Sequence, residues 1–221
     1  MNTEALMKAR HSVRQYTDKP LSAETVRALQ AEIAACSRES GLHIQLVTGE
    51  PEAFSGFMAH YGKFSGVKNY IAMIGKKGPD LEEMCGYYGE RLVLFAQGLG
   101  LNTCWVALTY RKRKTAFVID SGEKLCVVIA VGYGKNQGTP HKSKSPAEVS
   151  KTDGPVPDWF KRGVEAALLA PTAMNQQKFF LELKGNRVSA KAGLGFYTKM
   201  DLGIVKYHFE TAAGKRGWSL E

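Results

Sequence analysis

Apolar residues recur along this chain with two different spacings, and these spacings predict where helices and strands form. Recurrence every three or four positions is typical of amphipathic helices. Short runs that alternate, or that are rich in β-branched residues, indicate strands. Helices are thus predicted over 3–11, 23–39, 81–99 and from Trp159 to the stop at Pro171, and strands over 42–50, 67–75, 124–134 and 178–185. This mixture predicts an α+β or α/β fold.

The two longest predicted helices carry recognisable end signals. Ser22 stands at the N-cap position of the helix over 23–39, and Gly41 follows it as a stop signal. Glu82 and Glu83 fit the first turn of the helix over 81–99, because acidic side chains interact favourably with the positive end of the helix dipole.

One polar stretch divides the chain. Residues 135–158 are rich in Pro, Ser, Thr and Gly, a composition typical of a linker or a long surface connection. We therefore expect a single domain over 1–221, with a core half over 1–134 and a C-terminal half over 159–221.

Two segments share one order of elements. Residues 24–50 and 158–186 each run from a helix, through a break of small residues, to a strand. A partial duplication of one helix–loop–strand unit is one interpretation of this similarity. Common packing requirements are the other, and the pattern does not choose between them.

Composition narrows the class of protein. The 221 residues are 44% hydrophobic and 23% charged, as is typical of a globular protein. No apolar run approaches the roughly 20 residues that cross a bilayer, and the N-terminal segment lacks the apolar core of a signal peptide. We therefore expect a cytoplasmic protein.

The four cysteines are widely spaced without a C-x-x-C pair, which argues against a disulfide framework or a zinc site.

The net charge of +9 arises from 30 Lys and Arg against 21 Asp and Glu. This excess favours an anionic partner, namely a phosphorylated cofactor, nucleic acid or an anionic membrane surface. Composition does not distinguish among these three partners. The positions of the charged residues along the chain are needed to distinguish them.

The segment RHSVR places Arg10, His11, Ser12 and Arg14 within five residues at the end of a predicted helix. Arg10 can fork onto phosphate oxygens, and the Ser12 hydroxyl can donate a hydrogen bond. Arg14 can place positive charge against the electron-rich edge of a ring. Taken alone, the segment is better interpreted as a solvated basic helix end whose cations face the helix dipole.

Four motifs follow one another in a characteristic order. The first is RHSVR, followed by the aromatic Tyr16; the others are AQGLGLNTCW (96–105), VVIAVGYG (127–134) and HKSKSPAEV (141–149). Each is weak alone, but the ordered series resembles the nitroreductase family of FMN-dependent oxidoreductases. The resemblance implies an α+β fold of nitroreductase type, with a central, mostly antiparallel sheet flanked by helices.

The resemblance also implies an FMN site. Arg10 and Ser12, with His11 between them, would bind the FMN phosphate and neighbouring ribityl oxygens, and Arg14 would face the pyrimidine edge. Basic residues that close over the phosphate in the family are matched by Lys142 and Lys144.

Two departures from the family pattern change this site. The backbone of Ala107, Leu108 and Thr109 would pass the N5 and O4 edge of the flavin, where the family often has glycines, which permit the closest approach of a backbone. The loop A-P-S-x-x-N-x-Q-P-W, which the family carries after its second helix, is missing there and occurs late, as APTAMNQQ (170–177). Its implied flavin-facing residues are Pro171, Thr172, Asn175 and Gln177, in the same chain as the flavin or in a partner.

The activity implied by the resemblance is hydride transfer from NAD(P)H through FMN to a nitroaromatic, a quinone or a similar small electrophile. The flavin would carry the reactivity, so neither a catalytic side chain nor a metal is expected. A homodimer is expected because the family usually builds its flavin site at a subunit interface, and neither nucleic acid nor a membrane is expected as a partner. The alternatives are a flavin-binding or flavin-sequestering protein with little turnover and a basic nucleic-acid-binding protein.

Three further features have simpler interpretations. The run RKRK (111–114) lacks an accompanying RNA- or DNA-binding motif, which favours a solvated basic face or an attraction site for NAD(P)H phosphates. GLGFY (193–197) lacks the full glycine-rich dinucleotide motif and favours a turn. Asp201 and His208 lie seven residues apart on one helical face, as a general acid pair or, the favoured interpretation, with His208 as a structural histidine.

Overall fold

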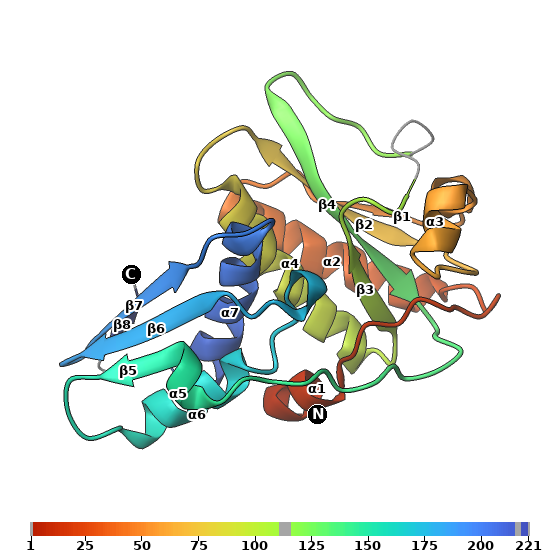
Figure 1. The fold of residues 1–221 in the computed structure, drawn as a ribbon. Coiled ribbons are helices and arrows are strands. Elements are labelled where there is room, and N and C mark those ends of the chain that lie inside the picture. Colours follow the sequence, from red (N-terminus) through yellow and green to blue (C-terminus); the bar gives the residue numbers. More distant parts are fainter. Residues whose placement is uncertain (1, 111–115, 215–217, 221) are drawn as a thin grey trace. The chain divides into compact units, whose positions relative to one another are not determined.

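Strands gather in two four-stranded sheets, each in its own unit of the chain (Figure 1). A computed structural model describes residues 2–110, 116–214 and 218–220. The first unit consists of Arg10–Leu81 and Arg91–Pro140. The second unit consists of the residues up to Ala9, Glu82–Glu90 and the chain from His141 onward, so the helix α4 (Leu81–Gly98) contributes residues to both.

The sheet of the first unit has the order β1-β2-β4-β3, and every neighbouring pair is antiparallel. Strand β2 is buried along both of its faces up to its last residue, because the sheet is covered on each side. The elements of this unit are α2 (Ala23–Ser40), β1 (Gln45–Val47), η1 (Glu52–Phe54), α3 (Phe57–Tyr61), β2 (Tyr70–Lys76), the second half of α4, β3 (Asn102–Val106) and β4 (Glu123–Gly132).

Helix α2 begins and ends where its sequence signals predict. The Ser22 hydroxyl accepts the backbone N–H of Thr25 at 3.1 Å, and Gly41 takes a φ of 72°, in the left-handed region that glycine enters without strain. Arg91 of α4 donates Nε to Glu32 at 2.6 Å and a terminal N–H to Glu39 at 2.7 Å, which fastens α2 to the second half of α4.

The core of the first unit is aromatic on one face of its sheet. Phe54 lies 5.4 Å from Phe64, 6.0 Å from Tyr70 and 6.1 Å from Tyr110 between ring centroids. Cys104 and Val106 of β3 belong to the same buried cluster. This cluster thus extends from the centre of the sheet to its β3 edge.

The sheet of the second unit has the order β5-β6-β7-β8 and mixes parallel with antiparallel pairs. Helix α6 packs against α7, where the ring of Phe209 lies so close to Gly163 that a β-carbon there would come within 2.5 Å of it. The elements are α1 (Thr3–Ala9), the first half of α4, α5 (Pro146–Val149), β5 (Ser150–Thr152), α6 (Asp158–Ala167), η2 (Ala173–Asn175), β6 (Phe179–Lys184), β7 (Arg187–Ala192), α7 (Thr198–Ala213) and β8 (Ser219–Leu220).

The α+β fold with a mostly antiparallel sheet is confirmed, with one sheet in each unit. The connection over 135–158 contains α5 and β5, which its composition does not reveal. The expectation of a single domain stays a prediction. None of the helices in the described ranges combines the length and the apolar character needed to span a bilayer.

Candidate flavin site

The segment RHSVR lies just after α1, which ends at Ala9, so the helix predicted over 3–11 stops two residues earlier than expected. Ser12 forms a parallel β-bridge with Thr103 of β3, and the N–H of Val13 donates to the carbonyl of Thr103 at 3.0 Å. Tyr16 bridges to Gly134, just beyond β4. Three of the four sequence motifs therefore lie side by side in the first unit.

The thiol of Cys104 hydrogen-bonds with Ser12 and lies in the electrostatic field of Arg14 and Arg10. Burial raises the pKa of Cys104, while the positive charge of Arg14, a hydrogen bond with Ser12 and the charge of Arg10 oppose the rise. Arg10 is only 3% exposed. A buried guanidinium beside a hydroxyl is a favourable environment for an anion, because charge-assisted hydrogen bonds are stronger than neutral ones.

Arg14 differs from Arg10 because its side chain is exposed. Its backbone carbonyl accepts the N–H of Ser65 at 3.0 Å, and its guanidinium lies 6.0 Å from the ring centroid of Phe64. The backbone is thus fixed while the charge is accessible from solvent.

His11 and Ser12 are covered by a tight turn over 134–138. A β-carbon on Gly138, which has a φ of 70°, would lie 2.7 Å from Cβ of His11 and 3.1 Å from the carbonyl oxygen of Ser12. Asn102 holds the turn, since its side chain accepts the N–H of Gly134 and donates to Gln137, both at 3.0 Å. Only glycine fits at position 138 in this arrangement.

The segment Ala107–Thr109 follows directly on β3. Ala107 and Thr109 are half-buried, whereas the side chain of Leu108 is 60% exposed. The three residues lie in the first unit, as Arg10–Arg14 does.

In the second unit, Gln177 connects the two other segments that the sequence assigns to the flavin, 142–144 and 171–177. Its side chain is 3% exposed and fully engaged. The amide oxygen accepts the backbone N–H of Lys144 at 2.9 Å, and the amide nitrogen donates to the carbonyl of Lys142 at 2.9 Å and to Oδ1 of Asn175 at 3.0 Å. The backbone N–H of Gln177 donates to the Thr172 hydroxyl at 3.0 Å.

The loop 172–177 has an unusual backbone, because Met174, Asn175 and Gln177 have φ values of 51°, 53° and 45°. Such left-handed residues persist where surrounding contacts fix them. Asp201 of α7 supplies such contacts: its carboxylate accepts the N–H of Ala173 at 2.9 Å and Nε2 of Gln176 at 2.7 Å. Burial raises the pKa of Asp201 to about 6, against the lowering effect of these two hydrogen bonds.

Asp201 and His208 do not bond to each other. His208 is fully buried, with Nδ1 3.0 Å from the carbonyl oxygen of Ala166 and Nε2 2.9 Å from the carboxylate of Glu90. A carbonyl can only accept, so Nδ1 carries a proton. His208 is therefore a structural histidine that connects α4, α6 and α7.

One protein-family model matches nearly the whole chain. The model described as "Putative TM nitroreductase" matches residues 2–213. The chain belongs to this nitroreductase family. No curated protein matches the chain.

Solved structures share the nitroreductase fold. A putative nitroreductase from Thermotoga maritima is 20% identical, with a TM-score of 0.68 over 96% of this chain and 83% of the other. A putative nitroreductase from Desulfovibrio desulfuricans, solved in complex with FMN, is 18% identical, with a TM-score of 0.54 over 71% of this chain and 99% of the other. A putative NADH dehydrogenase/NAD(P)H nitroreductase from Parabacteroides distasonis is 22% identical, with a TM-score of 0.51 over 67% and 97%.

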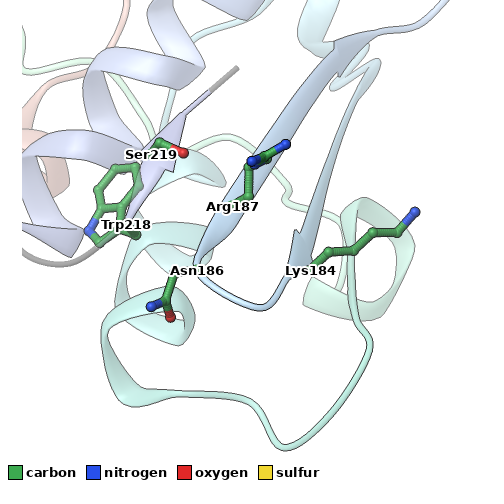
Figure 2. A pocket seen from close by; sticks show the side chains of 5 residues that line it. All are labelled: Lys184, Asn186, Arg187, Trp218 and Ser219. Atoms are coloured by element: carbon green, nitrogen blue, oxygen red, sulfur yellow. The ribbon is translucent and has the colours of Figure 1, made fainter.

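A surface hollow of this nitroreductase lies at the end of the β6–β7 hairpin (Figure 2). It is lined by Lys184, Asn186, Arg187, Trp218 and Ser219. The side chains of Lys184 and Arg187 extend away from Trp218, and Lys184 is paired with Glu182 at 3.0 Å. The basic groups do not converge on a common point, and no sequence-predicted site residue lines this hollow.

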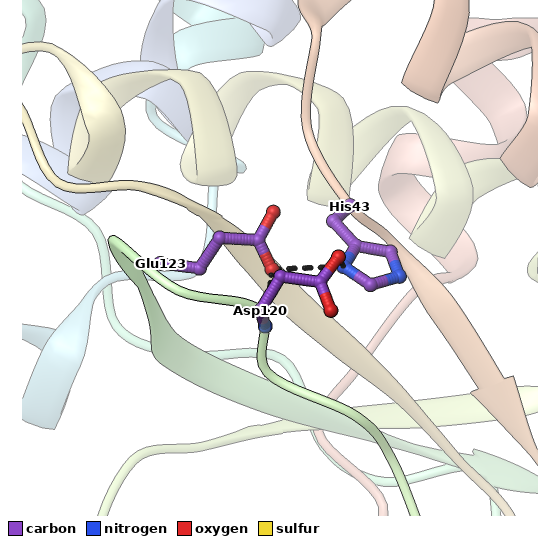
Figure 3. A group of neighbouring side chains, drawn as sticks. All are labelled: His43, Asp120 and Glu123. Atoms are coloured by element: carbon purple, nitrogen blue, oxygen red, sulfur yellow. Dashed lines mark hydrogen bonds and ion pairs between the residues drawn. The ribbon is translucent and has the colours of Figure 1, made fainter.

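His43, Asp120 and Glu123 form a cluster with metal-binding side chains (Figure 3). The amide nitrogen of Gln45 lies 3.1 Å from Nε2 of His43, so Nε2 accepts and Nδ1–H donates to Glu123 at 2.8 Å. Gln45 also donates to the carbonyl of Val118 at 2.6 Å. These hydrogen bonds satisfy the polar groups of His43 and Gln45 and connect the start of β1 to the residues at the start of β4.

Two other sequence features can be placed. GLGFY forms the turn between β7 and α7, as expected, with the carbonyl of Phe196 accepting Nε2 of Gln176 at 2.9 Å. The run RKRK lies outside the described residues. Sequence reasoning missed Asp201 and Gln176 as the residues that hold the 172–177 loop, because nothing in their spacing reveals that they meet.

Proposed function

We propose that this nitroreductase is an FMN-dependent oxidoreductase of the cytoplasm that takes hydride from NAD(P)H and passes it to a nitroaromatic, a quinone or a similar electrophile. The observation that carries the proposal is that Cys104 hydrogen-bonds with Ser12 and lies in the electrostatic field of Arg10 and Arg14, next to the Ser12–Thr103 bridge. The family resemblance assigns these three residues to FMN. Membership of the nitroreductase family supports the same conclusion.

The residues of the first unit fit a phosphate-bearing flavin. The guanidinium of Arg10 and the hydroxyl of Ser12 would donate to phosphate and ribityl oxygens, with His11 held in place by the turn at Gly138. Because β3 fixes the backbone at Ser12 and Val13, these donors are preorganised. Preorganisation lowers the conformational cost of binding.

Arg14 would interact with the flavin ring of FMN. Bound FMN would supply the chemistry of accepting and releasing hydride. The exposed guanidinium of Arg14 would place positive charge at the pyrimidine edge, where reduction makes the ring electron-rich. The backbone of Ala107, Leu108 and Thr109 would pass the N5 and O4 edge, and Leu108 would limit how closely it approaches.

The second unit supplies a separate set of proposed contacts. Lys142 and Lys144 provide positive charge for the phosphate, and Pro171, Thr172, Asn175 and Gln177 form the loop that the family turns toward its flavin. Gln177 supports this role because it fixes the backbone at Lys142 and Lys144 by hydrogen bonds. The proposed contacts of each unit can be tested separately by measuring the FMN affinity of variants in that unit.

Turnover separates the enzyme from a flavin-sequestering protein. FMN-loaded protein should oxidise NADH or NADPH rapidly when menadione or a nitroaromatic is present, and Arg14→Ala should lower the rate. Arg27→Ala, which removes another exposed arginine, from α2, is the matched control and should leave the rate unchanged. Tight FMN binding with no acceptor-dependent NAD(P)H oxidation would instead establish the sequestering alternative.

A further inference from the structure

A hollow of about 370 Å³ lies in the first unit, and we call it the Tyr133 hollow. Its walls come from the segment 16–21, the start of α2, the turn after β1, the residues just before β2 and the end of β4. Sites for small molecules typically have volumes of roughly 300–1,000 Å³ and combine apolar walls with a few polar groups. Among the described residues that line the hollow, none is assigned to FMN by the family resemblance. The hollow is therefore a candidate for a different ligand.

The inner wall of the Tyr133 hollow is apolar and partly aromatic. Tyr16 and Val131 are 2% and 1% exposed, so they form its buried side. Val26 of α2 and the ring of Tyr133 are half-buried and also line it. Aromatic side chains make favourable contacts with other flat rings. This wall therefore fits a ligand with a planar ring.

The amide of Asn69 provides a polar group in this wall. Its Oδ1 accepts the N–H of Gly49 at 3.1 Å, which sets the orientation of the amide. Its Nδ2 lies 3.5 Å from the carbonyl oxygen of Val131, beyond the usual range of about 2.7–3.2 Å for such a bond. Gly132 has no side chain to cover the amide, since a β-carbon there would lie 3.8 Å from Nδ2. Nδ2 can therefore donate to a ligand oxygen.

The charged residues of the Tyr133 hollow favour an anion. Two lysines line it against one acidic residue, Asp18. Nζ of Lys19 lies 4.2 Å from the ring centroid of Tyr133, and Nζ of Lys68 lies 2.8 Å from Oδ1 of Asp18. The Asp18 side chain is 89% exposed, and exposed ion pairs contribute only about 0–1 kcal/mol. Lys68 can therefore exchange this partner for the carboxylate of a ligand at little cost.

We propose that the Tyr133 hollow is a second small-molecule site, which binds a planar aromatic carboxylate. The ring would lie against Tyr16 and Tyr133. Lys68 would pair with the carboxylate, Lys19 would add positive charge, and the amide of Asn69 would donate to a ligand oxygen. The inference does not depend on the proposed flavin chemistry, because the two sites share no assigned residue.

Calorimetric titration tests the site with a defined probe. 2-Naphthoate, added to FMN-loaded protein, should bind saturably, and the uncharged 2-naphthamide should bind about fivefold more weakly or worse, because it lacks the charge that pairs with Lys68. Absence of 2-naphthoate binding at millimolar concentrations would overturn the inference, as would equal affinities for the two compounds.

Two substitutions at exposed positions should change the affinity in opposite directions. Lys68→Met should raise the Kd for 2-naphthoate about fivefold, because it removes the ion pair. Asp18→Asn should lower this Kd, because it releases Lys68 and removes a negative charge that repels the ligand. Lys76→Met, at the other end of β2, removes another exposed lysine of the same unit and should leave the Kd unchanged.

Val26→Trp tests the location of the ligand, because the larger side chain would fill part of the hollow. It should weaken 2-naphthoate binding while the Kd for FMN stays the same. Binding that Lys68→Met, Asp18→Asn and Val26→Trp all leave unchanged, or that only Arg14→Ala weakens, would place the ligand elsewhere and overturn the inference.

Discussion

Lys144 contacts Gln177 twice: its backbone N–H donates to the Gln177 amide oxygen, and its Nζ donates to the Gln177 backbone oxygen, both at 2.9 Å. These residues belong to two segments that the family pattern assigned to the same cofactor from distant parts of the sequence. The structure brings the segments together through a buried amide. The positions of Lys142 and Lys144 therefore depend on a residue that carries no charge.

Gln177→Leu should destabilise the protein and weaken FMN binding together. The leucine would leave the backbone N–H of Lys144 without its acceptor, and an unsatisfied buried donor costs roughly 1–3 kcal/mol. The carbonyl of Lys142 would keep the side-chain amide of Asn175 at 2.8 Å. Urea unfolding and FMN titration measure the two effects. Lys142→Met, at an exposed position, should weaken FMN binding while the free energy of unfolding changes by less than about 0.5 kcal/mol.

Arg10→Ala should raise the Kd for FMN about tenfold or more, because it removes a charge-assisted hydrogen bond worth roughly 1.5–3 kcal/mol. Fluorescence titration with FMN measures the change. The exposed Arg27 of α2 provides a control with the same loss of charge, and Arg27→Ala should leave the Kd within about twofold. Equal effects of the two substitutions would show that only net charge matters.

Asp201→Asn should change how stability depends on pH. Burial raises the pKa of Asp201 in the folded state to about 6, above its ordinary value of 3.8, so the folded protein binds this proton more tightly than the unfolded chain. The native protein should therefore lose stability relative to Asp201→Asn as pH rises from about 4 to 7, by up to about 3 kcal/mol. Urea unfolding at several pH values in this range measures it; a constant difference would contradict the assignment.

His208→Phe should strongly destabilise the protein without a direct effect on FMN contacts. Phenylalanine would remove the hydrogen bonds of His208 to the buried carboxyl of Glu90 and to the carbonyl of Ala166, and a buried polar group that loses its partner costs roughly 1–3 kcal/mol. Thermal unfolding measures the loss. Thr211→Ala, on the exposed side of the same helix, should change stability by less than about 0.5 kcal/mol.

Local signals in the sequence predicted much of the first unit. Ser22 and Gly41 mark the ends of α2, and the β-branched run before Gly132 marks β4, because caps and buried strands depend on neighbouring residues. The second unit was harder to predict. Strand β7 contains small and charged residues and therefore shows no clean period, whereas a helix was expected where α7 forms.

The candidate site shows the same division. Arg10, Ser12 and Arg14 lie close in sequence and could be assigned from a motif. The support from Asp201 and Gln176, and the packing of Gly138 against His11, join residues far apart in the chain. Such contacts depend on the tertiary fold and cannot be predicted from the spacing of residues in one sequence.

Identification of the chromophore tests the central claim most directly. Purified protein, as isolated or after incubation with FMN and removal of the excess, should show flavin absorbance and release FMN on denaturation, one molecule per chain by mass spectrometry. Protein that shows no flavin absorbance and takes up no FMN on titration would contradict the account.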